Sequence, residues 1–292
     1  MSAGRFAPSP TGVLHLGNLR TALLAWLFAR SAGSQFLVRM EDLDTGRVRP
    51  GLAEQQLADL VAVGLDWDGE VVAQSSRGEL YESALARLRE LRLLYECYCT
   101  RAEIREAASA AHGPLPEGAY PGTCLRLSAA ELAEKRAAGR PPALRVRAEG
   151  AAVAFDDRLL GRVAGVVDDF VVRRGDGAFA YNLAVVVDDA DQGVEEVVRG
   201  SDLADSTPRQ LWLARALELP EPSHAHVPLV LGPDGARLAK RHGDVTLREV
   251  APAAALAWIG ASLGFEGAVP IDWLPQFDPT RLPHADTIFH AH

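Results

Sequence analysis

The sequence predicts an α/β protein built on a doubly wound parallel sheet. Over the first third of the chain, apolar segments of strand length alternate with amphipathic segments of helix length, which is typical of parallel strands joined through helices. The 292 residues are 48% hydrophobic and 24% charged, so the chain can bury a sizeable core. The longest strongly apolar run, 22–29, is far too short to cross a bilayer, which argues against a membrane-spanning protein.

The elements of the first third can be placed one by one. Proline and glycine give the boundaries: the turn 8–12 ends the first strand, Pro50 suits the first turn of a helix, and Gly64 stops that helix. Within the helical segments, apolar residues recur at helical spacing. We expect strands at Gly4–Ala7 and Gln35–Met40, and helices at Leu16–Arg30, Pro50–Val63 and Gly78–Leu94.

The pattern changes near Cys97. Residues 97–150 carry eight Arg and Lys against six Asp and Glu, whereas residues 51–96 carry four against nine. We interpret this stretch as an inserted module with its own surface character. Across the module and beyond it we expect a helix at Ser128–Ala138, short β-rich segments from Ala151 to Arg174, strands at Ala178–Val187 and Glu195–Arg199, and a helix at Thr207–Leu217.

The charge balance limits the class of partner. The chain has 30 basic and 39 acidic residues and a net charge of −9, which argues against a sequence-blind polyanion binder. The excess of basic residues in 97–150 still leaves room for a local basic surface. The N-terminus lacks the apolar core of a signal peptide. We therefore expect a cytoplasmic protein that does not contact a membrane, and a monomer.

The turn between the first strand and the first helix carries chemistry. Residues 5–18 read Arg-Phe-Ala-Pro-Ser-Pro-Thr-Gly-Val-Leu-His-Leu-Gly-Asn. Free amides at a helix N-terminus attract phosphate, His15 can donate to a phosphate oxygen, and Gly17 lets a flat base or ribose lie on the backbone. Taken alone, His15 would more simply be a capping or core residue.

A second string of interest lies near the C-terminus. Residues 232–241 read Gly-Pro-Asp-Gly-Ala-Arg-Leu-Ala-Lys-Arg, and of the 30 basic residues only Lys135 and Lys240 are lysine. A lysine kept in a chain that otherwise uses arginine indicates a role, and in a mobile loop it can neutralise phosphate charge. The alternative is a solvated Lys-Arg pair after a turn.

The two strings together resemble the class I aminoacyl-tRNA synthetases, and residues 5–12 resemble the glutamyl branch. The HIGH signature of that class is similar to His-Leu-Gly-Asn at 15–18, with Asn18 in place of the final histidine. The KMSKS loop is similar to residues 237–241, with Arg237 for the first lysine, Ala239 for the serine, and the second lysine kept as Lys240. The resemblance implies catalytic roles for His15 and Lys240, and ATP binding by His15, Gly17, Asn18 and Lys240.

A third set of residues suits an acidic amino acid. A substrate with an ammonium group and two carboxylates needs a carboxylate partner and arginine forks. Glu41 follows the second strand, at the carboxyl end where parallel sheets bind ligands. Residues 181–189 and 198–203 resemble the second half of the glutamyl catalytic domain. The resemblance implies that L-glutamate is bound by Arg5, Phe6, Ala7, Pro8, Ser9, Glu41, Tyr181 and Arg199.

The three cysteines form the fourth set. Three thiolates and a fourth donor suit a structural zinc, although the Cys-x-Cys spacing is short for zinc, and buried inert cysteines are the alternative. The arrangement resembles a Cys-x-Cys…Tyr-x3-Cys site in short paralogues of glutamyl-tRNA synthetase. It implies one zinc held by Cys97, Cys99, Tyr120 and Cys124, and His112, a chemically better donor than a phenol, stays as the alternative to Tyr120.

The resemblance covers about residues 4–245 and implies a division of the chain. The first half of a Rossmann-like catalytic domain is expected at 1–96, the inserted module with its zinc site at 97–175, the second half with the KMSKS-like loop at 176–245, and a short helical segment and tail at 246–292. The 52 residues after Lys240 are too few for the helical anticodon-binding domain of a full glutamyl-tRNA synthetase, so we expect none.

The expected activity is therefore that of the short paralogues of glutamyl-tRNA synthetase. The resemblance implies that ATP, with Mg²⁺, activates L-glutamate to glutamyl-adenylate. The glutamyl group then passes to the queuosine base at the wobble position of tRNA(Asp), with the anticodon arm as the bound partner. Two alternatives stay open at this point: a compact glutamyl-tRNA synthetase that charges the tRNA 3′ end, and a catalytically silent RNA-binding paralogue.

Overall fold

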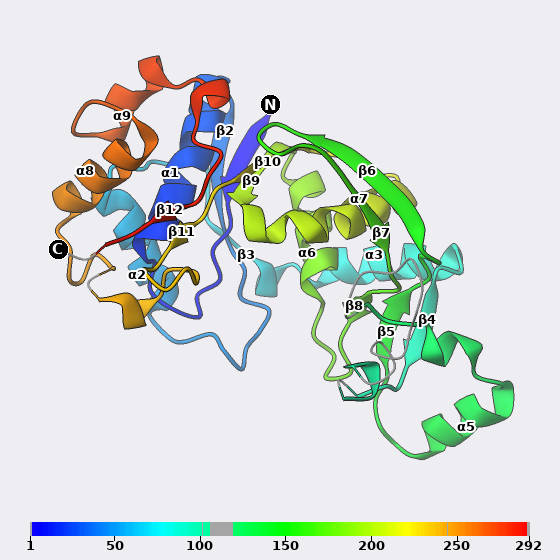
Figure 1. Cartoon of the computed structure of the whole chain (residues 1–292). Coiled ribbons are helices and arrows are strands. Elements are labelled where there is room, and N and C mark those ends of the chain that lie inside the picture. Colours follow the sequence, from blue (N-terminus) through cyan, green and yellow to red (C-terminus); the bar gives the residue numbers. More distant parts are fainter. Residues whose placement is uncertain (1, 101, 106–118, 244, 291–292) are drawn as a thin grey trace.

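The main feature of the computed structural model is a seven-stranded sheet with the order β3-β2-β1-β9-β10-β6-β7 (Figure 1). The structure describes residues 2–100, 102–105, 119–243 and 245–290, with the Lys240 side chain left out. The strands are β1 (Ala3–Phe6), β2 (Gln35–Met40), β3 (Val72–Ala73), β6 (Ala151–Asp157), β7 (Gly161–Val167), β9 (Val194–Gly200) and β10 (Ser223–Val227). All neighbours from β3 to β6 are parallel, and only β7 is antiparallel to its neighbour β6. The predicted doubly wound parallel sheet is confirmed.

Helices join these strands and cover the sheet. They are α1 (Leu16–Ser31), α2 (Leu52–Ala62), α3 (Gly78–Glu90), α6 (Tyr181–Asp191) and α7 (Thr207–Ala216). The predicted bounds of α1, α2, α7 and β2 agree with these to within a few residues. The helix predicted at Gly78–Leu94 is too long by one turn, because Arg92 takes a φ of 57° beyond α3 and Leu94 begins the next strand.

The strand predicted at Ala178–Val187 is wrong, because α6 occupies most of this segment. Every side chain from Leu183 to Asp189 is buried, so the apolar run is continuous and the helical period cannot be seen in it. The three consecutive valines at 185–187 strengthen the false strand signal through their β-branched side chains. Tertiary burial thus overrides the local propensity in this segment.

A second, three-stranded sheet lies at one end of the molecule. It contains β4 (Leu94–Cys97), β5 (Ala143–Val146) and β8 (Val171–Arg173), paired antiparallel, and α5 (Ala129–Ala137) lies beside it (Figure 1). Ser128 caps α5 through a hydrogen bond to the Glu131 amide, as the predicted helix there requires. Between β5 and β8 the chain forms β6 and β7, which extend the main sheet rather than the small one.

The C-terminal elements gather at the opposite end (Figure 1). They are β11 (Val230–Leu231), α8 (Pro252–Leu263), α9 (Pro270–Trp273) and β12 (Thr287–Ile288). β12 pairs in parallel with β11, and Leu282 and Phe289 on either side of it are buried in the core around α1. Short 3₁₀ turns lie at Gln74–Ser76, Thr123–Arg126, Ser201–Ser206, Lys240–His242, Leu274–Gln276 and Pro279–Arg281. None of the described helices is both long and apolar enough to span a membrane.

The buried interior also contains a network of charged side chains from β2, α6 and the start of α3. The Arg39 side chain, on β2, is fully buried, and its guanidinium lies 2.8 Å from Asp189 and 3.6 Å from Asp188. Asp188 is also fully buried and accepts hydrogen bonds from Arg77 at 2.6 Å and from Tyr81 at 2.9 Å. This network joins α6 to β2 and to the start of α3, so the two halves of the sequence are held together by paired charge.

We predict that Asp188→Asn lowers the free energy of unfolding by about 3 kcal/mol, because the fully buried Arg39 and the partly buried Arg77 lose their shared carboxylate. Urea unfolding followed by circular dichroism measures this. The matched control is Asp191→Asn, since Asp191 lies on the same helix and pairs with the same Arg77, but its side chain is 48% exposed. That control should cost less than about 1 kcal/mol, and equal losses for both variants would contradict the assignment.

Candidate functional site

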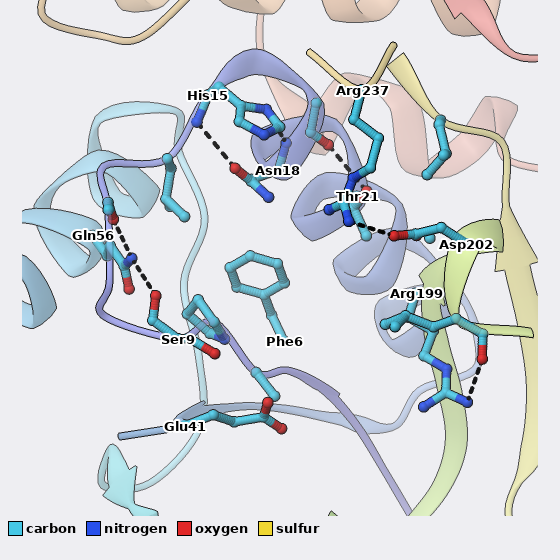
Figure 2. Close-up of a pocket in the computed structure, with 18 of the residues that line it drawn as sticks. Phe6, Ser9, His15, Asn18, Thr21, Glu41, Gln56, Arg199, Asp202 and Arg237 are labelled. Atoms are coloured by element: carbon cyan, nitrogen blue, oxygen red, sulfur yellow. Dashed lines mark hydrogen bonds and ion pairs between the residues drawn. The ribbon is translucent and has the colours of Figure 1, made fainter. Parts of the chain in front are cut away.

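A cavity of about 510 Å³ opens at the carboxyl ends of β1 and β9 (Figure 2). β1 pairs with β2 on one side and with β9 on the other, so the strand order reverses at this point. Ligands of open parallel sheets bind at such a switch point. The cavity is lined by the turn after β1, the first turn of α1, the end of β9, and residues 229–230 and 237–238.

The cavity brings together all the predicted glutamate and nucleotide residues whose side chains the structure describes. They come from four separate parts of the chain, and Figure 2 labels most of them around one hollow. Those that line it are Arg5, Phe6, Ala7, Pro8, Ser9, His15, Gly17, Asn18, Glu41, Tyr181 and Arg199. Lys240 begins the 3₁₀ turn that follows the loop at 232–239, but its side chain lies outside the described part of the structure.

His15 is the N-cap of α1. Its Nδ1 accepts a hydrogen bond from the Asn18 amide at 3.2 Å, and the Asn18 side-chain oxygen accepts one from the His15 amide at 3.1 Å. Because Nδ1 is an acceptor, the ring proton of neutral His15 lies on Nε2, where it can be donated to a ligand. Burial, followed by the positive charge of Arg237, lowers the pKa of His15 to about 4. His15 is therefore a neutral donor at neutral pH.

Gly17 leaves the space that this arrangement requires. A Cβ atom at this position would lie 3.1 Å from the His15 ring and 3.3 Å from the Val230 side chain. A side chain here would therefore press on the capping ring and on the opposite cavity wall. Asn18, which departs from the family signature, closes the reciprocal cap described above.

Acidic and basic groups meet at the inner end of the cavity. Arg5 is buried and donates to Asp189 at 3.2 Å and to the Val198 carbonyl at 3.4 Å. Glu41 lies 3.6 Å from the buried Arg39 guanidinium. Burial raises the pKa of Glu41, while the charges of Arg39 and Arg5 oppose that rise. A cationic group bound beside Glu41 would favour its ionised form.

Arg199 is held from several sides at once. Its guanidinium donates to the Tyr181 hydroxyl at 3.3 Å, to the Thr207 hydroxyl at 2.8 Å and to the Leu203 carbonyl at 3.4 Å. Its Nε donates to Nε2 of His226 at 3.1 Å. The group is 4% exposed, so this charge is presented to the cavity from a fixed, buried position.

Sequence reasoning missed several residues that shape the cavity. Gln56 on α2 donates to the carbonyl oxygens of Ser9 and Gly12, which holds the turn after β1 in place. Arg237 lines the cavity and pairs with Asp202 at 2.6 Å (Figure 2). The sequence indicates the Arg237 position as the counterpart of the first lysine of the KMSKS motif. The contacts of Gln56 and the pairing of Arg237 with Asp202 could not be predicted, because their partners come from distant segments.

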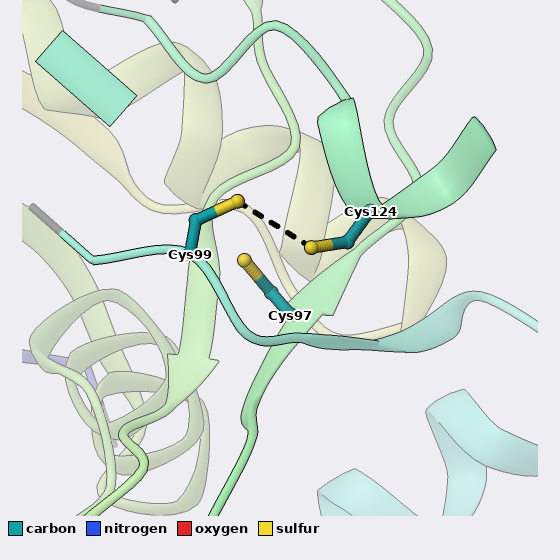
Figure 3. Close-up of side chains that lie close together, drawn as sticks. All are labelled: Cys97, Cys99 and Cys124. Carbon is teal, nitrogen blue, oxygen red and sulfur yellow. Dashed lines mark hydrogen bonds between the residues drawn. The ribbon is translucent and has the colours of Figure 1, made fainter. Parts of the chain in front are cut away.

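The three cysteines converge between β4 and the 3₁₀ turn 123–126. The Sγ atoms of Cys97, Cys99 and Cys124 all lie within 4.8 Å of one another and point inward (Figure 3). The Tyr120 hydroxyl lies 3.5 Å from the Cys97 sulfur and 3.6 Å from the Cys99 sulfur. Burial and the neighbouring sulfur atoms raise the pKa of Cys99 to about 12, so three thiolates would coexist here only around a cation. The donor set fits a metal ion, and His112 lies outside the described residues.

A second cavity of about 830 Å³ lies between the first cavity and the cysteines. It shares Ser9, Glu41 and Tyr181 with the first cavity, and Cys97 and Cys99 with the cluster. Arginines at 140, 145 and 174 line it, together with the acidic residues 44 and 176. The inner end of the first cavity therefore shares its lining with a larger hollow that carries three arginines and three acidic residues.

Comparisons with known proteins agree with this site. The family model described as "tRNA synthetases class I (E and Q), catalytic domain" matches residues 3–252. A glutamyl-Q tRNA(Asp) synthetase of Nocardia farcinica is 63% identical over 96% of this chain and 91% of its own length. Another glutamyl-Q tRNA(Asp) synthetase, from Symbiobacterium thermophilum, is 51% identical over 97% of this chain and 94% of its own length.

Solved structures extend the similarity to the fold. A glutamate tRNA ligase of Elizabethkingia meningosepticum, determined in complex with its amino acid, superposes with a TM-score of 0.83 at 26% identity, over 99% of this chain and 67% of that one. The glutamate-tRNA synthetase of Elizabethkingia anophelis gives 0.84 at the same identity. The cavity at the strand switch point, the family match and the near full-length relatives agree. The chain belongs to the glutamyl-Q tRNA(Asp) synthetases, within the class I synthetase family for glutamate and glutamine.

Proposed function

We propose that this enzyme activates L-glutamate with ATP and transfers the glutamyl group to the queuosine base of tRNA(Asp). In the first step a glutamate carboxylate oxygen attacks the α-phosphorus of ATP, a new P–O bond forms, and the bond to the β-phosphate breaks to release pyrophosphate. The observation that carries the proposal is that one cavity combines a helix N-terminus with a set of opposed charges. In this proposal residues 1–96 and 176–245 form the catalytic domain, and residues 97–175 form an inserted module whose strands β6 and β7 extend the main sheet.

The charged end of the cavity suits glutamate. Arg5 and Arg199 offer guanidinium groups to its carboxylates, Glu41 offers a carboxylate to its ammonium group, and Tyr181 adds a hydroxyl. Phe6, Ala7, Pro8 and Ser9 form the adjoining wall. Because Arg5 and Arg199 are buried and already oriented by protein partners, they lose little freedom when a substrate binds.

The other end of the cavity suits ATP. The Gly17 amide and the Nε2 proton of His15 are the donors for phosphate oxygens, since the Leu16 and Asn18 amides already donate to the Val245 carbonyl and to His15 Nδ1. Mg²⁺ enters with ATP and screens the phosphates. Lys240 and Arg237, on the loop across the cavity, would neutralise charge as pyrophosphate leaves. We assign the catalytic roles to His15 and Lys240.

We predict that the enzyme catalyses ATP–pyrophosphate exchange with glutamate in the absence of tRNA. Glutamine should give at least about 100-fold lower kcat/KM, because arginine forks placed for a carboxylate leave an amide poorly paired. Exchange of labelled pyrophosphate into ATP measures both rates, with a reaction lacking any amino acid as the control. Equal rates with glutamine and glutamate would overturn the substrate assignment.

The second cavity supports an acceptor that reaches glutamyl-adenylate from the side of the inserted module. Arg140, Arg145 and Arg174 line this approach beside Glu41, Asp44 and Asp176, and arginine side chains can donate to phosphate oxygens even in an acidic chain. We propose that the anticodon arm of tRNA(Asp) enters here and presents its queuosine. We propose that the enzyme acts as a monomer in the cytoplasm, where tRNA is available.

We predict that tRNA(Asp) bearing queuosine accepts labelled glutamate even after its 3′-terminal adenosine is removed. Transfer RNA(Asp) lacking queuosine should accept none. Acid-precipitable label on the two RNAs, each tested with and without the 3′ adenosine, gives the comparison. Loss of charging after 3′ trimming, or equal charging without queuosine, would favour a compact enzyme that charges the tRNA 3′ end.

We further propose that the cysteine cluster holds one structural zinc, with Tyr120 as the fourth ligand. Three sulfur donors and one oxygen within bonding reach suit tetrahedral zinc, and the cluster is separate from the nucleotide end of the first cavity. The Arg145 guanidinium lies 3.7 Å from the centre of the Tyr120 ring, but burial raises the pKa of Tyr120, so the bound cation would have to favour the ionised phenol. The expected role is to hold β4 against the turn that follows Tyr120.

We predict that protein purified without chelators contains about one zinc per chain. Cys124→Ser should lose most of it and lower the melting temperature. Tyr120→Phe keeps the stacked ring but removes the donor oxygen, so it should weaken zinc retention in a competition with a chelator. Full retention by Tyr120→Phe would favour His112, and elemental analysis that finds no zinc in the unaltered chain would contradict the site.

A further inference from the structure

Three neighbouring strands carry a buried line of polar side chains that ends on Arg199. Asp157 closes β6, His226 lies on β10 and Arg199 on β9. The register of the sheet places His226 directly beside Arg199, and it places His224, two residues earlier on the same strand face, beside Asp157. All three side chains are buried, with exposed fractions of 0%, 0% and 4% for Asp157, His226 and Arg199.

The hydrogen bonds run in one direction along this line. Nδ1 of His226 lies 2.6 Å from the Asp157 carboxylate, and Nε2 of His226 lies 3.1 Å from Nε of Arg199. An arginine Nε is always a donor, so Nε2 of His226 must accept, and the imidazole proton must lie on Nδ1, facing Asp157. Both ends of the ring therefore require the same tautomer.

Asp157 is itself held as an anion. It accepts from the Leu159 and Leu160 amides at 3.0 and 2.9 Å, and from the His226 amide at 3.2 Å. Although burial opposes ionisation, the hydrogen bonds from His226 and from these amides lower the pKa of Asp157 to about 2. The pKa of His226 is lowered by burial and by the nearby positive charge of Arg199. The hydrogen bond to Asp157 acts in the other direction and raises it, but the net shift is downward. The ring is thus neutral at neutral pH and free to accept from Arg199.

We propose that His226 is a positioning residue that aims Arg199 at the glutamate substrate, with Asp157 fixing the tautomer that makes this possible. The inference rests on the proposed function, because it takes Arg199 as a ligand of glutamate. Nε of Arg199 is the nitrogen that sets the plane of the guanidinium, so a fixed acceptor at Nε limits rotation of the whole fork. ATP lies toward the other end of the cavity and does not depend on this contact.

Two substitutions of His226 separate the acceptor from the bulk of the ring. In His226→Asn the short amide can still donate to Asp157 but offers no acceptor at the position of Nε2. In His226→Gln the longer amide can place its oxygen there. We expect His226→Asn to raise the KM for glutamate at least about tenfold, as for a lost hydrogen bond to a charged group. The KM for ATP should change less than about twofold, and His226→Gln should recover most of the loss.

The matched control is His224→Asn. His224 lies on the same face of β10, is 3% exposed, and stacks on the His226 ring with the ring centres 5.8 Å apart. His224→Asn removes a buried ring but leaves Nε2 of His226 as the acceptor for Arg199. It should therefore leave the ratio of the KM for glutamate to the KM for ATP unchanged. If both His226 variants instead raise the KM for glutamate and for ATP alike, the role of His226 is only structural and the proposal is overturned.

A measurement on the unaltered enzyme does not depend on the folding of any variant. In protein labelled with ¹⁵N-histidine, the His226 signals are identified by their loss in His226→Gln or, if that variant does not fold, through contacts with the Phe155 ring, whose centre lies 6.2 Å from that of the His226 ring. Protonation on Nδ1 supports the proposal, whereas protonation on Nε2 would overturn it. An unaltered enzyme that shows no glutamate-dependent exchange would instead contradict the proposed function, and it would do so before any variant is compared.

Discussion

The buried carboxylate of Asp189 is the interaction on which the rest of the site depends. It pairs with Arg5 on β1 and with Arg39 on β2, at 3.2 and 2.8 Å, although these partners lie 184 and 150 positions away in the sequence. Arg39 in turn neighbours Glu41. Asp189 on α6 therefore orients the Arg5 guanidinium directly. Through Arg39 it also orients Glu41, the one carboxylate among the residues that we assign to glutamate binding. The cavity can exist only when α6 is packed against the first two strands.

The parts of the fold that depend on local pattern could be predicted from the sequence. Boundaries with a proline, a glycine or a capping residue are right to within a few residues, as for α1 and α2. The error at α6 arises mainly because its buried central residues leave no polar face to show the helical period, and the valines at 185–187 add to it. The pairing of β6 with β10 joins the ends of two segments far apart in sequence, and no local pattern reveals it.

The same division holds for the candidate site. Residues 5–18 run without a break from the end of β1, through the turn, into the start of α1. Their sequence and their geometry therefore correspond closely, and His15 is held in place as the N-cap of α1. The supporting residues Asp157 and His226 were not predicted, because they act through contacts between segments and lack a motif of their own. The cysteines are intermediate: their spacing suggests a metal, but only the fold brings three sulfur atoms within 4.8 Å.

The pairing of β12 with β11 has a consequence for how the enzyme is made. Val230 on β11 lines the nucleotide-facing cavity, and its neighbouring strand, Thr287–Ile288, follows every residue assigned to glutamate and ATP in the sequence. Until those residues emerge, the wall opposite Gly17 lacks its partner strand, and Leu282 and Phe289 are absent from the core that supports α1. A nascent chain that already contains every residue assigned to glutamate and ATP therefore still lacks a finished cavity until Thr287–Ile288 has been made and has paired with β11.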